Sequence, residues 1–377
     1  MEASSDVAVV GAGVVGCAAA LALARRGASV ALLEAESAPG LAASGTNSGI
    51  LHTGFDSVPG ELETELIVRS AALRDPVLEA FDLAIVRCGA VLRPRNDDER
   101  AAVRELAANA AGNGVHVALQ EDGALSVPGE AICDPVAYTA ALAAAAQRHG
   151  AALRTSFRVG AMQRGGEHFR VEGNDGTEVR CRVLVNCAGL YADQVARLGG
   201  DESFEIYPRK GEFLVFDPPA EPLEEIRLPV PSKRTKGVLV FPTVDGKVVA
   251  GPTAVDGDDK TDWTVRAEAR DEIVPKAAEL LPELEGAEPI AAYAGLRPAG
   301  RGVNYVIGAS RECPGLVNVA AIRSTGVTAS LGIAEHVTGI IGELGVELGP
   351  EAPLETAPPT PSETPWWRSV AEYRGVA

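Results

Sequence analysis

Residues 6–34 read DVAVVGAGVVGCAAALALARRGASVALLE, and this stretch decides the fold. A short apolar, β-branched run predicts a strand, a glycine-rich turn leads into an Ala/Leu-rich helix, and a second apolar run predicts a parallel strand. We expect Gly11 to permit the tight turn, Gly13 to allow close approach of a pyrophosphate, and Gly16 to let the helix pack on the strand. The stretch therefore predicts dinucleotide binding.

An acidic residue closes this unit. Glu34 lies 23 residues after Gly11, about where a carboxylate accepts hydrogen bonds from an adenosine ribose. The N-terminus of the intervening helix offers N–H groups and a positive dipole end to phosphates. A plain strand–helix–strand unit without a ligand is the alternative, which this combination disfavours. No arginine follows Glu34 directly, which disfavours NADP, and the motif alone does not separate NAD from FAD.

Size and charge narrow the class of protein. The chain has 377 residues, enough for two domains that share one ligand cleft. Its formal charge of −18 argues against nucleic acid and against an anionic membrane as partners, because both would repel it. If the substrate is itself an anion, the positive charge that binds it has to be concentrated in clustered Arg and Lys.

Cysteine usage indicates the compartment. The six cysteines are scattered, with no CxxC and no neighbouring histidine, so we expect no metal site and no disulfide framework. The first strand begins almost at Met1, which leaves no room for a signal peptide, and no apolar run approaches the roughly 18 residues of a membrane span. We expect a cytoplasmic protein with no integral membrane segment, and peripheral association with a membrane stays open.

The remaining chain alternates helical and strand-like patterns. We expect a charged amphipathic helix over 97–112, and a helix that Asp134 caps. We expect a helix with an interruption at Pro76, and β-rich, Pro-rich character from about Tyr207. The tail from Gly345 reads as an extended or partly disordered arm, whose Trp pair at 366–367 predicts that its end docks on something.

A run of small and polar residues at 41–54 lacks the periodicity of a buried helix. It reads LAASGTNSGILHTG and suits a backbone packed tightly against a flat or charged group. Its Ser, Thr and Asn side chains supply donors to a pyrophosphate. An ordinary surface loop is the alternative, which the embedded apolar pair and single histidine disfavour.

These pieces, in this order, resemble the FAD-dependent oxidoreductases of the D-amino-acid oxidase-like class. Within that class they are similar to the branch of glycerol-3-phosphate dehydrogenases and L-2-hydroxyglutarate oxidases. The order of the motifs selects FAD over NAD. The matching segments are 11–34, 45–54, 186–193, 208–212, 231–237, 242–253, 295–298 and 323–328.

The resemblance implies an α/β fold with a discontinuous, Rossmann-like FAD-binding domain and a β-rich α+β substrate domain. The FAD-binding domain would comprise 1–80, 140–205 and 290–345. The substrate domain would comprise 81–139 and 206–289, followed by a C-terminal extension, 346–377.

The resemblance also implies a set of cofactor-binding residues. Val159 would offer its backbone to the adenine, and the residues from Gly326 would place a helix N-terminus at the flavin pyrimidine ring, where a dipole stabilises reduced flavin. The full set is Gly11, Gly13, Gly16, Glu34, Ser44, Thr46, Asn47, Ser48, Val159, Ala188, Gly189, Gly326, Val327 and Thr328.

Oxidation of a secondary alcohol needs a base and cations that orient an anionic substrate. His52 is the candidate base, with a structural histidine or a covalent flavin anchor as alternatives. Arg297 is the candidate clamp for a carboxylate or phosphate, because its planar fork makes two parallel bonds, and an interdomain salt bridge is its alternative. Lys210 and Arg323 are supporting cations. The basic run Lys233, Arg234 and Lys236 is a solvated loop or steers an anion.

The predicted function is oxidation of the CH–OH group of a small anionic substrate by hydride transfer to flavin N5. Glycerol 3-phosphate and a 2-hydroxy acid such as L-2-hydroxyglutarate are the candidate substrates, and dioxygen, a quinone or a carrier protein is the electron acceptor. An amine or amino-acid oxidase of the same fold is one alternative. A non-catalytic FAD electron-transfer subunit, with the tail as its docking arm, is another. No cysteine follows Cys313, so we expect no iron–sulfur relay in this sequence.

Overall fold

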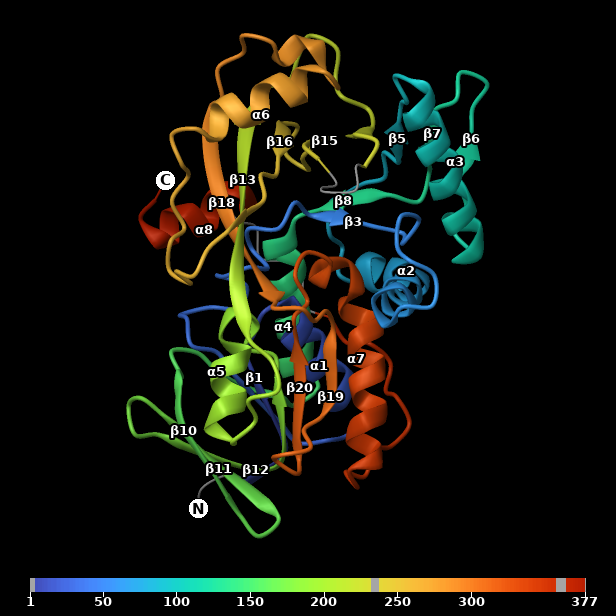
Figure 1. Ribbon diagram of the computed structural model, residues 1–377. Helices are drawn as coiled ribbons and strands as arrows, with labels where there is room; N and C mark the ends of the chain where they lie inside the picture. The colour runs from blue at the N-terminus through green and yellow to red at the C-terminus, as the bar shows by residue number, and fades with distance from the viewer. Residues whose placement is uncertain (1–3, 232–236, 357–363, 377) are drawn as a thin grey trace.

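The computed structural model describes residues 4–231, 237–356 and 364–376. Within these residues the chain forms two large sheets, one in each half of the molecule, with a small three-stranded sheet (Figure 1). Helices α1, α4 and α7 lie beside the sheet in the half that holds the N-terminus, and α3 and α6 lie in the other half (Figure 1). The architecture is α/β, as predicted.

The first sheet is built around the opening strand. Its strand order is β10-β11-β12-β1-β2-β9, and β20 pairs with the second part of β12 and carries β19. β1 pairs in parallel with both β2 and β12. The strands are β1 Ser4–Val10, β2 Val30–Leu33, β9 Ala152–Arg154, β10 Val159–Gly165, β11 His168–Gly173, β12 Glu178–Asn186, β19 Val306–Ala309 and β20 Leu316–Ala320.

The second sheet has the order β17-β13-β16-β15-β14-β5-β7-β6, and β18 pairs antiparallel with the long strand β13. Its strands are β5 Ala90–Leu92, β6 Ala118–Leu119, β7 Leu125–Val127, β13 Ile206–Phe216, β14 Ile226–Leu228, β15 Leu239–Pro242, β16 Val248–Gly251, β17 Val255–Asp256 and β18 Ala291–Gly300. The small sheet joins β3 Ile50–Leu51, β8 Ala131–Cys133 and β4 Ile85–Val86. The predicted domain division stays a prediction, but β18, which it assigns to the FAD-binding domain, belongs to the second sheet.

Capping side chains explain where two of the described helices begin. The helices are α1 Val14–Ala24, α2 Leu62–Ala80, α3 Asp97–Gly112, α4 Pro135–Arg148, α5 Ala192–Leu198, α6 Ala269–Ala278, α7 Gly326–Glu343 and α8 Trp366–Arg374, with single 3₁₀ turns at Gly189–Tyr191 and Pro282–Leu284. Asn96 caps α3 by accepting from the Glu99 N–H, and Asp134 caps α4 by accepting from two backbone N–H groups. The predicted interruption at Pro76 is wrong, because α2 continues through that residue.

Small residues let α1 approach the sheet and its neighbours. A side chain at Gly16 would put a Cβ 1.9 Å from the Gly11 carbonyl oxygen, so only glycine fits there. α1 is almost wholly buried, and its apolar face joins the core of β1, β2 and α7. This packing fixes the turn that precedes the helix.

The tail returns to the body of the protein. Val346 is buried, and the backbone near Gly349 and Ala352 is held by Arg25 and Arg26 in an extended course, as predicted. Residues 364–376 contain the helix α8, with its Trp pair buried in the core of the second sheet. The tail therefore docks on its own chain, which removes the Trp pair as an arm for a partner.

Candidate functional site

A cavity of about 610 Å³ opens where the glycine-rich turn meets the ends of β2 and β12. It brings together twelve of the predicted site residues. They are Gly11, Gly13, Gly16, Glu34, Ser44, Asn47, Val159, Ala188, Gly189, Arg323, Gly326 and Val327. Residues far apart in the sequence thus line one cofactor-sized space.

The N-termini of two helices line this cavity. The N-cap residues, Gly13 for α1 and Thr325 for α7, make no side-chain capping hydrogen bond, and neither helix carries an acid in its first turn. Ser44 Oγ accepts from the Val14 N–H at 3.0 Å. Two positive helix ends without competing acids favour an anion in the space between them.

Glu34 ends β2 and is fixed in place by the turn. Its Oε2 accepts from the Ala12 N–H at 2.6 Å and its Oε1 from the Glu36 N–H at 2.9 Å. Burial raises the pKa of the Glu34 carboxyl, against the lowering effect of these hydrogen bonds. The carboxylate is therefore oriented at the edge of the cavity, as a ribose-binding acid has to be.

A second cavity of about 490 Å³ lies beside the first. Four residues, Ala43, Asn47, Arg323 and Ser324, line both spaces. The second cavity also contains the predicted residues Thr46, Ser48, His52 and Arg297. A substrate in the second cavity would therefore lie next to a cofactor in the first.

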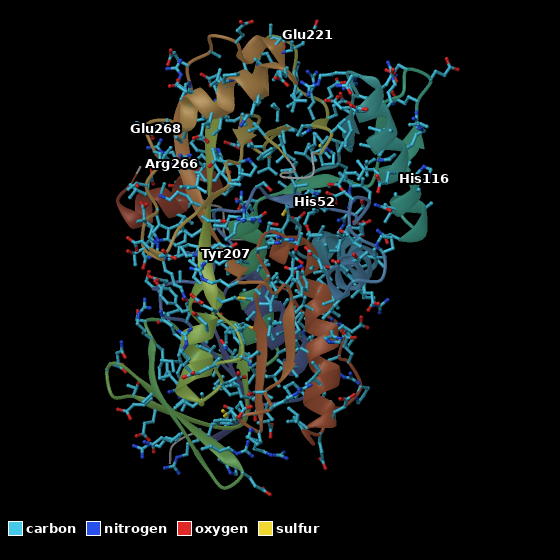
Figure 2. All side chains as sticks on the ribbon, viewed as in Figure 1. His52, His116, Tyr207, Glu221, Arg266 and Glu268 are labelled. Carbon is cyan, nitrogen blue, oxygen red and sulfur yellow. The ribbon has the colours of Figure 1, made fainter. Side chains whose placement is uncertain are left out.

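His52 stands between the two halves of the molecule (Figure 2). Its Nδ1 lies 2.8 Å from Glu130 Oε2, and the Glu130 side chain is fully buried. Glu130 Oε1 accepts from both the backbone N–H and the hydroxyl of Thr53. Because a carboxylate only accepts hydrogen bonds, this contact puts the ring proton on Nδ1 and leaves Nε2 as an acceptor.

Buried Arg74 holds the backbone around His52 and Glu130 in place. Its guanidinium donates to the carbonyl oxygens of Leu51, His52 and Gly129 at 2.6–2.9 Å. Burial lowers the pKa of Arg74, and the nearby charge of Glu130 opposes that shift. The sequence reasoning missed both Arg74 and Glu130, because each lies 20 to 80 residues from His52 with no pattern that links them.

Arg297 enters the second cavity from β18. Its Nη2 donates to the Thr253 carbonyl oxygen at 3.2 Å, and no carboxylate contacts it among the residues that the structure describes. Burial, together with the charges of Arg209 and Arg323, lowers the pKa of Arg297 to about 10. Three arginines thus form one cationic cluster, in which Arg297 lacks a counterion.

A glycine makes room for this guanidinium. Gly211 on β13 faces β18, and a Cβ built there would lie 2.2 Å from Arg297 Nη2. Arg209, two residues earlier, forms a bidentate ion pair with Asp256, to which its Nε and Nη2 donate. The motif at 208–212 therefore shapes the cationic cluster through Arg209 and Gly211.

Two predicted site residues line neither cavity. Lys210 is buried with its Nζ 2.5 Å from Asp262 Oδ2, and it lines neither cavity. Thr328 accepts from the His52 N–H and donates to the Ile50 carbonyl, so it holds the loop without lining a cavity. The basic run Lys233, Arg234 and Lys236 lies outside the described residues.

Two further observations exclude classes of site within the described chain. No group of three or more His, Cys, Asp or Glu gathers there in a way that could hold a metal ion. No described helix combines the length and the apolar character needed to cross a membrane.

Comparison with known proteins agrees with this geometry. A family model described as FAD-dependent oxidoreductase, DAO, matches residues 6–340. A glycerol 3-phosphate dehydrogenase of Caloramator mitchellensis is 31% identical over 360 residues, covering 91% of this chain and 75% of that protein. A mitochondrial L-2-hydroxyglutarate dehydrogenase of Bos taurus is 29% identical, covering 67% of this chain and 61% of that protein.

A solved structure gives the same result for the fold. The dithionite-reduced L-α-glycerophosphate oxidase of Mycoplasma pneumoniae, with FAD bound, superposes with a TM-score of 0.86 and 25% identity, covering 92% of this chain and 96% of that chain. The donor set of the first cavity fits FAD: the N-terminus of α1 suits the diphosphate, Glu34 suits the ribose, and the N-terminus of α7 suits the negative charge of reduced flavin. The chain belongs to the DAO family of FAD-dependent oxidoreductases.

Proposed function

We propose that this flavoenzyme oxidises the secondary hydroxyl of glycerol 3-phosphate, with Arg297 binding the phosphate and His52 accepting the hydroxyl proton. The observation that carries the proposal is the cationic cluster of Arg209, Arg297 and Arg323. In a chain of charge −18, a partly buried guanidinium that no described carboxylate contacts marks the place of an anionic ligand.

The proton route follows from the His52–Glu130 pair. Nδ1 is engaged by Glu130, so Nε2 is the nitrogen that takes the hydroxyl proton. FAD supplies, when bound, the acceptor for the hydride that leaves the carbon. Glu130 stays a hydrogen-bond acceptor and stabilises the imidazolium that forms.

The choice of a phosphate over a dicarboxylate has two supports. The basic residues of the described second cavity form one cluster, which suits a substrate with one anionic group, whereas L-2-hydroxyglutarate carries two. The glycerol 3-phosphate dehydrogenase also aligns with a larger share of this chain, 91%, than the L-2-hydroxyglutarate dehydrogenase does, 67%.

An anaerobic substrate screen tests the proposal. The purified protein is mixed with sn-glycerol 3-phosphate, L-2-hydroxyglutarate or glycine, and flavin bleaching is followed. We expect glycerol 3-phosphate to bleach the flavin. Faster bleaching by L-2-hydroxyglutarate than by glycerol 3-phosphate would identify L-2-hydroxyglutarate as the substrate. Bleaching by glycine alone would identify the protein as an amine oxidase. Flavin that no substrate reduces in the isolated chain would favour the electron-transfer subunit.

Arg297 variants test the clamp. Arg297→Ala removes a guanidinium that no described carboxylate contacts, and we expect the apparent dissociation constant for glycerol 3-phosphate to rise by about 100-fold. Gly211→Ala keeps the charge but forces the guanidinium to move, so we expect a smaller rise.

Arg301→Ala is the matched control, because Arg301 is half-exposed and pairs with Glu205 and Asp258 away from both cavities. Its affinity for substrate should equal that of the parent. Unchanged affinity in Arg297→Ala would remove the clamp.

Reoxidation identifies the acceptor in the same experiment. Dioxygen or a soluble quinone is added to the reduced protein, and the compound that reoxidises the flavin faster is assigned as the class of electron acceptor.

We place the protein in the cytoplasm, on the support of six cysteines that are all free thiols.

A further inference from the structure

The helix α8 reaches the first cavity from the far end of the sequence. Arg374 and Val376 line that cavity together with Gly11 and Glu34. In Figure 1, α8 lies beside β13 and β18, in the half of the molecule that holds the second sheet. One wall of the FAD cavity is therefore contributed by a segment outside the 6–340 family match.

The start of α8 is anchored firmly. Trp366 and Trp367 are 2% and 6% exposed, and Trp366 meets Tyr293 edge-on at 5.6 Å between ring centroids. Trp367 Nε1 donates to Asp245 Oδ2 at 3.1 Å. A Cβ at Gly45 would lie 2.6 Å from Val370 Cγ2, so the helix also packs closely on the loop that carries Ser44 and Thr46.

The end of α8 is held at the cavity. Arg374 Nη2 donates to Glu36 Oε1 at 3.2 Å and to the Leu41 carbonyl oxygen at 2.8 Å, and its Cζ lies 4.9 Å from the centroid of the Trp263 ring. Tyr373 donates to the other oxygen of Glu36. Arg374 Nε is buried and has no hydrogen-bond partner within the described residues.

The charge of the cavity gives Arg374 a role. Two carboxylates, Glu34 and Glu36, line it, and both repel an anionic ligand. Three described basic residues line the cavity. Arg158 forms an ion pair with Glu36, with Nη2 3.5 Å from Oε1, and Arg323 lies at the border with the second cavity. Arg374 is the remaining cation, and it lies against the loop that follows Glu36.

We propose that α8 is the outer wall of the cofactor cavity and that Arg374 supplies positive charge to the FAD diphosphate. Its guanidinium, whose charge Glu36 compensates only in part, fits a doubly charged anion. The Trp anchor then determines where this charge stands. Retention of FAD depends on a residue that lies beyond the motifs of the sequence.

The test measures binding of the cofactor and its fragments. Arg374→Gln removes the charge and keeps a polar side chain, so we expect the dissociation constant of FAD to rise about tenfold, with a weaker dependence on salt. Binding of ADP, which carries the diphosphate, should weaken as much, whereas binding of adenosine should not change. Arg374→Lys should retain most of the affinity.

Two further variants separate charge from structure. Arg368→Gln, on the exposed face of α8 where Arg368 pairs with Glu372, should bind FAD like the parent. Glu36→Gln breaks the tie to Arg374 but removes a negative charge, so FAD binding should stay equal or tighten. Equal weakening in Glu36→Gln and Arg374→Gln would reduce Arg374 to a structural tie, and unchanged FAD and ADP binding in Arg374→Gln would overturn the proposal.

Discussion

At the scale of single residues, the most informative contact is the one between His52 and Glu130. A histidine in a loop can take either tautomer, and which nitrogen carries the proton decides whether it accepts or donates toward a substrate. Glu130, buried and held by Thr53, removes that choice. The buried Glu130 carboxylate therefore orients the His52 ring and selects its tautomer, as the third group of a nucleophile–base set orients the base.

Glu130→Gln tests this orientation. Thr53 donates to one side-chain oxygen, so the amide of the glutamine would turn its NH₂ group toward His52. His52 Nδ1 would then accept, and Nε2 would carry the proton and lose its function as a base. We expect the rate of anaerobic flavin reduction by glycerol 3-phosphate to fall by about 100-fold or more, with little change in substrate affinity.

Thr53→Val serves as the control for this change. It removes one hydrogen bond to Glu130 and leaves the backbone N–H that holds the same oxygen, so the reduction rate should fall only slightly. A Glu130→Gln protein that reduces its flavin within threefold of the parent rate would contradict the orienting role.

At the scale of elements, Lys210 shows how a strand is tied to the wall of the cofactor cavity. Its Nζ is buried and joins Asp262 Oδ2 and the Thr264 carbonyl oxygen. Trp263 and Thr264 of the same segment line the first cavity. The lysine that the motif predicts as a substrate cation instead has a carboxylate partner of its own and positions this segment.

The ion pair makes part of the stability pH-dependent. The hydrogen bond from Lys210 lowers the pKa of Asp262 to about 2, so its stabilising effect is present above about pH 4 and is lost as the pH falls toward 2. Asp262→Asn should lower the free energy of unfolding by roughly 1 kcal/mol at pH 7, a modest value because Asp262 is half-exposed.

Urea unfolding at pH 7, 5, 4 and 3 measures this difference, which should shrink below pH 4. Asp258→Asn, at a strongly exposed pair with Arg301, should have almost no effect at any pH. A difference between parent and Asp262→Asn that persists unchanged at pH 3 would contradict the assignment.

At the scale of the whole molecule, local signals predict local structure well. The strand–turn–helix at 6–34, the helix over 97–112 and the Asp134 cap all appear as expected, because neighbouring residues decide each of them. The cofactor cavity follows for the same reason, since its glycines and Glu34 stand at fixed offsets in one unit.

Contacts between segments far apart in the chain could not be predicted from the sequence. Glu130 lies 78 residues from His52, and Arg374 lies 338 residues from Glu36, and no periodicity links such pairs. The pairing of Lys210 with Asp262, 52 residues away, could not be predicted for the same reason. Tertiary packing of the second sheet decides these positions, and a single sequence carries no local signal for it.

Because the cavity collects residues from segments throughout the chain, FAD should stabilise the whole fold. Its lining comes from the first strand unit, the 41–47 loop, the 187–191 segment after β12, α7 and α8, which are separated in the unfolded chain. Free FAD at 100 times its dissociation constant adds about 2.7 kcal/mol, or about 3 °C in melting temperature for a chain of this size. We expect removal of FAD to lower the melting temperature by that amount and addition to restore it. Riboflavin, which lacks the adenosine diphosphate, should restore less, because it does not contact the Glu34 end of the cavity. Equal melting temperatures with and without FAD would mean that the folded chain does not bind FAD at the concentration used, which would contradict the cavity as the FAD site.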